Sequence, residues 1–127
     1  MPQVLLIDDE RFLLVRLERT FRTAGYDVLV AASVGEGIAL ACANRPDLIV
    51  LDRTLPKVEG AFPAEILRST PQTASIPLIF LSRRPKQRAA RVRQTPSLHK
   101  PFRPSQLLDL VHSRLNEPNQ IGTIPIS

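Results

Sequence analysis

Three carboxylates, one hydroxyl and one ammonium group each follow a short apolar stretch in this chain. Asp8 and Asp9 come directly after one apolar run, Asp52 after another, Ser82 after a third, and Lys100 after a brief strand-like segment. Three carboxylates brought together repel unless a cation or raised pKa values relieve them, and one lysine cannot balance three negative charges. A few carboxylates open to water suit octahedral Mg²⁺. The residues therefore predict a magnesium site, provided that these apolar stretches end close together in the folded chain.

The same residue types suit phosphoryl transfer. That reaction needs in-line positioning and positive charge around the phosphoryl oxygens, and a carboxylate can attack phosphorus to give an aspartyl phosphate. We predict Asp52 as the nucleophile, with Mg²⁺ held by Asp8, Asp9 and Asp52. Lys100 and Ser82 would contact the remaining phosphoryl oxygens.

The elements that must position these residues follow from the apolar pattern. Four runs are apolar throughout, as in strands buried on both faces: residues 4–7, 28–31, 48–51 and 78–81. A short fifth strand fits residues 97–99. Helical spacing is expected over residues 10–24, 34–44 and 61–70 and after Pro104, with a short or irregular helix over 86–94. This alternation predicts an α/β fold with a doubly wound, five-stranded parallel sheet, helices on both faces, and functional groups at the carboxyl ends of the strands.

Local signals support three of the helix boundaries. Gly25 follows the first helical pattern as a left-handed stop. Ser33 with Glu36 three residues later predicts a capping box at the start of the second helix, and Asn44 to Pro46 closes that helix.

In this order and on these elements, the motifs resemble the receiver domain of response regulators in two-component signalling, over about residues 3–116. The resemblance implies a flavodoxin-like fold with strand order 2-1-3-4-5. The matching motifs are Asp8-Asp9, residues 51–60 (LDRTLPKVEG), Ser82 and Lys100-Pro101-Phe102.

The family implies a role for each matching position. Asp52 would be the phosphoacceptor, and Mg²⁺ would be bound by Asp9, by Asp52 and by the backbone carbonyl of Thr54, with Asp8 acting largely through water. The bond before Pro101 would be cis and would aim Lys100 at the site. The phosphoryl donor would be a histidine kinase or a histidine phosphotransfer protein. Such a chain is no turnover enzyme, because it promotes only its own phosphorylation and dephosphorylation.

Some positions depart from the family pattern. Arg83 stands where the family usually has a small residue. Like Thr54, Arg83 would lie beside the phosphoryl group. There it would either shield that group from attacking water or block the phosphodonor. Arg53 adds positive charge at the rim. Ser97 replaces an aromatic switch residue, and the segment from Ser82 to Lys100 is shorter than usual. We therefore expect the output of phosphorylation to be altered.

Composition limits the remaining options. The chain has 127 residues, 43% of them hydrophobic, and carries neither an apolar run of membrane-spanning length nor an export signal. A lone Cys42 cannot form an internal disulfide, which favours a reducing, cytoplasmic compartment. We expect a receiver domain over residues 1–116 and a C-terminal tail or linker over 117–127.

Charge is unevenly distributed along the chain. Residues 1–80 hold eight Lys and Arg against ten Asp and Glu, whereas residues 81–127 hold nine against two. The basic stretch 83–93 is interpreted as a solvated helix face or a docking surface for an acidic partner, and output would pass by protein contact through the 83–116 face. Nucleic-acid binding is the weaker interpretation, because no DNA-reading motif accompanies the stretch. Membrane insertion is not expected, and a homodimer is left open.

Alternative functions remain. The chain could be a non-relaying pseudo-receiver that docks through the basic 83–93 face. A hydrolase of the haloacid-dehalogenase type would need a second carboxylate two residues after the nucleophile, where Thr54 stands. Asp8 and Asp9 could also serve merely as helix caps, and His99 as a packed strand-end side chain rather than a phosphohistidine or metal ligand.

Overall fold

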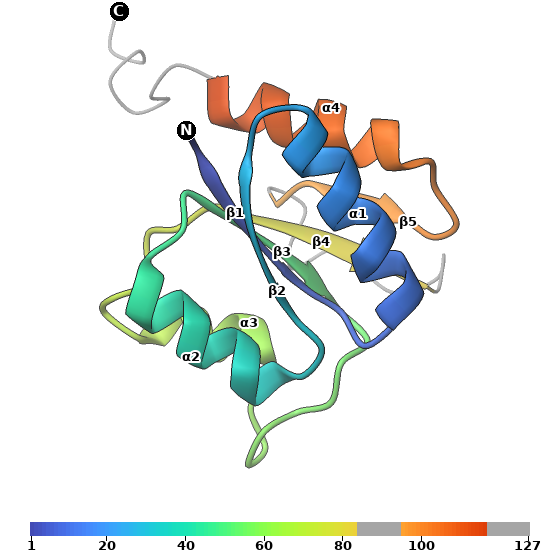
Figure 1. Ribbon diagram of the computed structural model, residues 1–127. Helices are drawn as coiled ribbons and strands as arrows, with labels where there is room; N and C mark the ends of the chain where they lie inside the picture. The colour runs from blue at the N-terminus through green and yellow to red at the C-terminus, as the bar shows by residue number, and fades with distance from the viewer. Residues whose placement is uncertain (84–94, 117–127) are drawn as a thin grey trace, which may run out of the picture.

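The computed structural model describes residues 1–83 and 95–116. Strands and helices alternate along the described chain (Figure 1). The elements are β1 (Gln3–Ile7), α1 (Arg11–Thr23), β2 (Asp27–Ala31), α2 (Val34–Asn44), β3 (Leu48–Asp52), α3 (Pro63–Ser69), β4 (Leu78–Ser82), β5 (Ser97–His99) and α4 (Pro104–Asn116). The predicted strands are confirmed within one residue at each end. The helix predicted over 86–94 and the tail predicted over 117–127 lie outside the described residues.

The five strands form one parallel sheet in the order β2-β1-β3-β4-β5, which confirms the predicted fold class and strand order. In the register of the sheet, Leu6 of β1 lies between Val30 of β2 and Val50 of β3. Because all strands run the same way, their carboxyl ends meet at a single edge. That edge is where the chemistry-bearing residues were predicted to gather.

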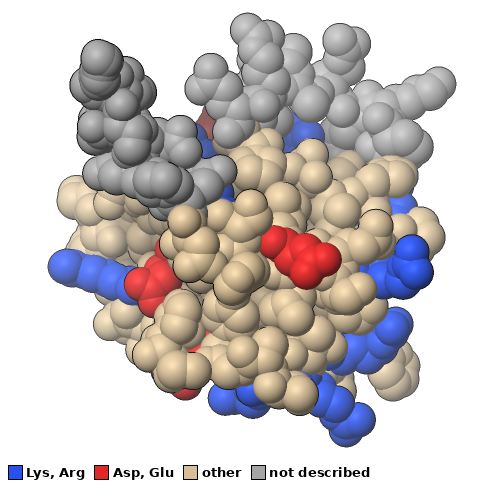
Figure 2. Space-filling view, turned by 90° about the horizontal axis from the view of Figure 1, so that it is seen from above, with Lys and Arg blue, Asp and Glu red and all other residues tan. Residues whose placement is uncertain are grey.

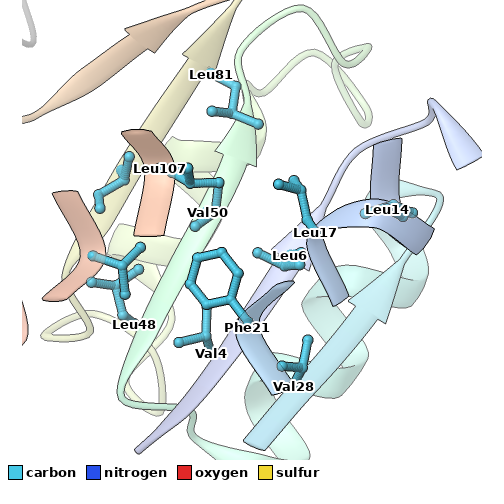
Figure 3. Packing of buried hydrophobic residues seen from close by; sticks show 12 residues of the cluster. Val4, Leu6, Leu14, Leu17, Phe21, Val28, Leu48, Val50, Leu81 and Leu107 are labelled. Carbon is cyan, nitrogen blue, oxygen red and sulfur yellow. The ribbon is translucent and has the colours of Figure 1, made fainter. Parts of the chain in front are cut away.

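Helices cover both faces of the sheet (Figure 1). Val4 and Leu6 of β1 belong to the core beneath α1 and α4, whereas Leu5 and Ile7 belong to the core beneath α2 and α3. In the first of these cores, Phe21 of α1 lies over β1, where it is fully buried (Figure 3). Burial on both faces explains why the strands are apolar at every position rather than at alternate ones.

The helix ends largely follow the sequence signals. Gly25 adopts φ 99° after α1, and Arg45 closes α2 with φ 47°. The Ser33 side chain accepts a hydrogen bond from the Glu36 N–H, but the Glu36 carboxylate accepts from the N–H of Ala32 instead of that of Ser33. In the predicted capping box, the donor to the Glu36 carboxylate is therefore Ala32, one residue before the usual donor. Helix α3 is shorter than the 61–70 expected.

On the face seen in Figure 2, basic side chains lie mainly along the right and lower right of the view, and acidic ones form small separate groups. The described part of the basic 83–93 stretch is Arg83 alone. Across residues 1–83 and 95–116, no helix is both long and apolar enough to cross a bilayer.

Helix α2 approaches β1 closely through Gly37. A Cβ atom built there would lie 2.6 Å from Ile7 Cδ1 and 2.9 Å from both Cγ atoms of Ile7, whereas one at Gly35 would meet nothing within 4 Å. Ile7 is itself buried and cannot move aside freely. The two glycines of one helix therefore differ in what they tolerate.

We expect Gly37→Ala to lower the free energy of unfolding by about 1–2 kcal/mol, because overpacking outweighs the gain in helix propensity. Gly35→Ala is the matched control and should be neutral or stabilising by about 0.5 kcal/mol. Urea unfolding followed by circular dichroism measures both. Equal effects of the two substitutions would contradict the close approach of α2 to β1.

Candidate functional site

Backbone hydrogen bonds fix the strand ends that carry the predicted site residues. The Asp8 N–H donates to the Ala31 carbonyl (3.1 Å), and the Lys100 N–H donates to the Ser82 carbonyl (2.8 Å). Asp52 is the last residue of β3, paired with Leu81 of β4. The sheet thus brings Asp8, Asp52, Ser82 and Lys100 to one edge, as the sequence predicted.

Lys100 is the central cation of this edge. Its Nζ lies 2.8 Å from Asp8 Oδ2, 3.2 Å from Asp52 Oδ2 and 3.2 Å from Glu10 Oε2. The Lys100 side chain is only 10% exposed. Burial alone would lower the pKa of Lys100, but the charges and hydrogen bonds of Asp8 and Asp52 outweigh it, and the pKa is raised. Lys100 therefore stays cationic at neutral pH.

The two buried carboxylates differ in their hydrogen-bond donors. Asp52 Oδ1 accepts from both the backbone N–H (2.7 Å) and the hydroxyl (2.6 Å) of Thr54. Burial would raise the pKa of Asp52, but these two bonds and Lys100 lower it overall. In Asp8, burial dominates over Lys100 and the N–H of Glu10, and its pKa is raised. Asp52 is thus the carboxylate held firmly in its ionised form.

The acidic residues can hold a metal ion. Asp8, Asp9 and Asp52 each offer an oxygen within 4.8 Å of those of the other two. Asp8 Oδ2 is buried, and its contact in the described structure is with the Lys100 ammonium at 2.8 Å. Carboxylate oxygens gathered this closely, one of them fully buried, fit a hard divalent cation such as Mg²⁺. Ligation by the Thr54 carbonyl stays a prediction.

Arg83 lies inside this acidic group. Its Nη2 is 2.6 Å from Asp9 Oδ1, 3.2 Å from Glu10 Oε2 and 3.4 Å from Asp52 Oδ2. Burial would lower the pKa of the guanidinium, but Asp52 and Asp9 outweigh it, and the pKa is raised. The sequence placed Arg83 near the phosphoryl position, whereas the structure shows it paired with the carboxylates themselves.

Glu10 is the site residue that sequence reasoning missed. Its carboxylate contacts both cations of the site, Lys100 and Arg83, at 3.2 Å. The available signal was its position directly after Asp8-Asp9, which makes three consecutive acids at the end of one strand. The Asp8 Oδ1 also accepts a hydrogen bond from the Glu10 N–H at 2.8 Å, which closes a turn before the helix. The N-cap of α1 is Glu10, without a side-chain cap hydrogen bond, so the capping role considered for Asp8 and Asp9 is not seen.

The remaining predicted positions surround this group. Ser82 is buried at the end of β4, which lies between β3, whose last residue is Asp52, and β5, which Lys100 follows. The Lys100-Pro101 peptide bond is cis. Ser97 is exposed at the start of β5, and His99 is exposed at its end, outside the acidic metal-binding group. The Arg53 guanidinium lies over the Phe80 ring, 5.3 Å from its centroid.

Comparison with known proteins places this geometry in a family. The model of the response regulator receiver domain matches residues 4–112. The chain belongs to this family. The parallel sheet of this receiver, in the order β2-β1-β3-β4-β5, is that of the flavodoxin-like receiver fold.

The receiver also matches individual relatives. It is 42% identical over 82 residues to the DNA-binding dual master transcriptional regulator RpaA of Synechocystis sp., covering 65% of this chain and 34% of RpaA. The receiver spans 34% to 36% of the length of the first curated relatives that it matches.

Two solved structures show the same architecture. The response regulator from Desulfuromonas acetoxidans has a TM-score of 0.80 at 25% identity, covering 91% of this chain and 97% of that chain. The chemotaxis response regulator CheY4 of Vibrio cholerae has a TM-score of 0.77 at 28% identity, covering 91% and 98%.

Removal of the central cation should destabilise the fold. We expect Lys100→Met to lower the free energy of unfolding by about 3 kcal/mol at pH 7, because Asp8 and Asp52 lose their buried counter-charge. Since the folded pKa of Lys100 is raised, its contribution is complete at neutral pH and would fall only as the pH rises through that pKa. As the pH falls, the difference should shrink first through protonation of Asp8, whose pKa is raised. It should shrink further only below the ordinary value of 3.8, where Asp52, whose pKa is lowered, is protonated.

Denaturant unfolding at several pH values measures this effect. Lys57→Met is the matched control, because Lys57 is exposed and its Nζ lies over the Phe62 ring. This substitution should cost no more than about 1 kcal/mol. A pH-independent loss in Lys100→Met, or an equal loss in both variants, would contradict the role given to the buried ion pair.

Proposed function

We propose that this receiver accepts a phosphoryl group on Asp52 from a histidine-phosphorylated protein, a histidine kinase or a phosphotransfer protein, in a Mg²⁺-dependent reaction. The observation that carries the proposal is the state of Asp52. Its side chain is 0% exposed yet has a lowered pKa, with Oδ1 bound by Thr54 and Oδ2 facing Lys100. An ionised, oriented carboxylate is what nucleophilic attack on phosphorus needs.

Each residue of the site has a role in this reaction. The phosphorus–nitrogen bond of the donor breaks while an Asp52 oxygen–phosphorus bond forms, and the departing nitrogen keeps the bonding electron pair. Lys100 and Ser82 would neutralise or bind the phosphoryl oxygens. Asp8, Asp9 and Asp52 would hold the Mg²⁺, which supplies positive charge to the transferred group when bound.

The proposal extends to the setting of the reaction. The chain would act in the cytoplasm as a signalling phosphoprotein and not as a turnover enzyme, promoting only its own phosphorylation and dephosphorylation. Its output would pass through protein contact on the 83–116 face. The exposed Ser97 offers no aromatic ring to move inward, so that this output would differ from the usual aromatic switch.

A second candidate is a receiver that docks without relaying phosphate. The contacts of Arg83 with Asp9 and Asp52 favour it, because they place a cation among the very carboxylates on which the relay depends. The complete set of Asp8, Asp9, Asp52 and Lys100 at one edge favours the relay.

Incubation with a small-molecule phosphodonor and Mg²⁺, followed by intact mass spectrometry, separates the two. We expect the parent chain to gain the mass of one phosphoryl group and Asp52→Asn to gain none. Asp109→Asn, which changes an exposed carboxylate on α4, should be modified like the parent. EDTA should abolish the modification. An unmodified parent, or a modified Asp52→Asn variant, would refute phosphorylation at Asp52.

A further inference from the structure

The acidic edge contains its own source of positive charge in Arg83. The guanidinium contacts one oxygen each of Asp9, Glu10 and Asp52 at 2.6, 3.2 and 3.4 Å. Asp9 and Asp52 also belong to the group of three residues that could ligate a metal ion. The same carboxylates therefore serve two cations, one built into the chain and one supplied by the solvent.

Arg83 and a divalent ion cannot share these carboxylates without cost. A carboxylate oxygen that accepts a guanidinium hydrogen bond is a weaker ligand for Mg²⁺, which requires near-ideal octahedral geometry. Two cations held beside the same oxygens also repel each other. Binding of the ion is thus coupled to loss of the contacts of Arg83.

Exposure shows that Arg83 can leave without disturbing the sheet. The Arg83 side chain is 39% exposed, and that of Asp9 is 51% exposed. The preceding residue, Ser82, is anchored because its carbonyl accepts the Lys100 N–H at 2.8 Å. Rotation of one long side chain therefore suffices, and exposed ion pairs of this kind are weak enough to be replaced.

The carboxylates of the site outnumber its cationic side chains in the described structure. Four carboxylates, those of Asp8, Asp9, Glu10 and Asp52, face the two cations Arg83 and Lys100 in the described structure. Lys100 is 10% exposed and held by buried partners, so that Arg83 is the cation more readily displaced.

We propose that Arg83 is an internal counter-ion that competes with a divalent cation for Asp9 and Asp52, so that binding of the ion displaces the guanidinium and uncovers Asp52. The inference rests on the proposed use of the acidic group as a metal site. It deepens that function, because Arg83 sets the cation concentration at which the receiver becomes competent for phosphorylation. The Asp52 side chain, 0% exposed beneath these contacts, is protected until then.

Calorimetric titration with MgCl₂ tests the competition, and it suits a chain that contains no tryptophan for fluorescence. We expect Arg83→Ala and Arg83→Gln to bind Mg²⁺ about two- to fivefold more tightly than the parent, since a competing ion pair of ordinary strength is removed. Arg83→Lys retains the charge and should stay closer to the parent than either neutral variant does. Unfolding curves of the four proteins verify that each is folded.

Arg11→Ala is the matched control. Arg11 is exposed, is next to Glu10 in sequence and makes no ion pair with the acidic group among the described residues. Its removal should change the Mg²⁺ affinity by less than about twofold, since an exposed charge without a direct contact is largely screened. Equal gains in Arg11→Ala and Arg83→Ala would overturn direct competition in favour of a general charge effect.

Other outcomes also decide the question. Unchanged or weaker Mg²⁺ binding in Arg83→Ala, or no binding by any variant, would overturn the inference. Tighter binding in Arg83→Ala together with an unmodified Asp52 in the mass-spectrometric experiment would support the competition while refuting phosphorylation. The two proposals can therefore fail separately.

Discussion

The buried ion pairs of Lys100 hold the acidic edge together. Asp8 and Asp52 end neighbouring strands, and both are almost fully buried. The only described residue that contacts both with a buried ammonium is Lys100, which follows β5 and reaches across β4. A buried charge without its partner is strongly destabilising. The observed strand order brings the two carboxylates together and places Lys100 within reach of both.

One lysine serves two carboxylates whose proton affinities are nevertheless shifted in opposite directions. The pKa of Asp8 is raised and that of Asp52 is lowered, although both contact the same ammonium. The difference comes from Thr54, which gives Asp52 a backbone and a hydroxyl donor. Short-range hydrogen bonding, rather than the shared cation, therefore distinguishes the two carboxylates. Asp52 is suited to reaction, and Asp8 is suited to a structural or metal-binding role.

Much of this arrangement can be predicted from sequence, because it depends on backbone topology. Apolar runs such as residues 48–51 identify buried parallel strands, and parallel strands bring Asp8, Asp52 and Lys100 to one edge. The ion pairs of Glu10 and Arg83 could not be predicted in this way. Each of these long side chains can adopt many rotamers. The rotamer that it adopts depends on neighbours that lie more than 70 residues away from it in the sequence. The Glu36 bond to Ala32 was missed for a similar reason, since side-chain reach decides between adjacent amides.

The two bonds from Thr54 to a single oxygen make the Asp52 carboxylate asymmetric. In a free carboxylate the two oxygens are chemically equivalent and interchange by rotation of the group. Here Oδ1 is pinned by its neighbour in sequence, and Oδ2 alone faces the cationic side chains. Two hydrogen bonds from one residue thereby restrict the rotation of a carboxylate group that is fully buried.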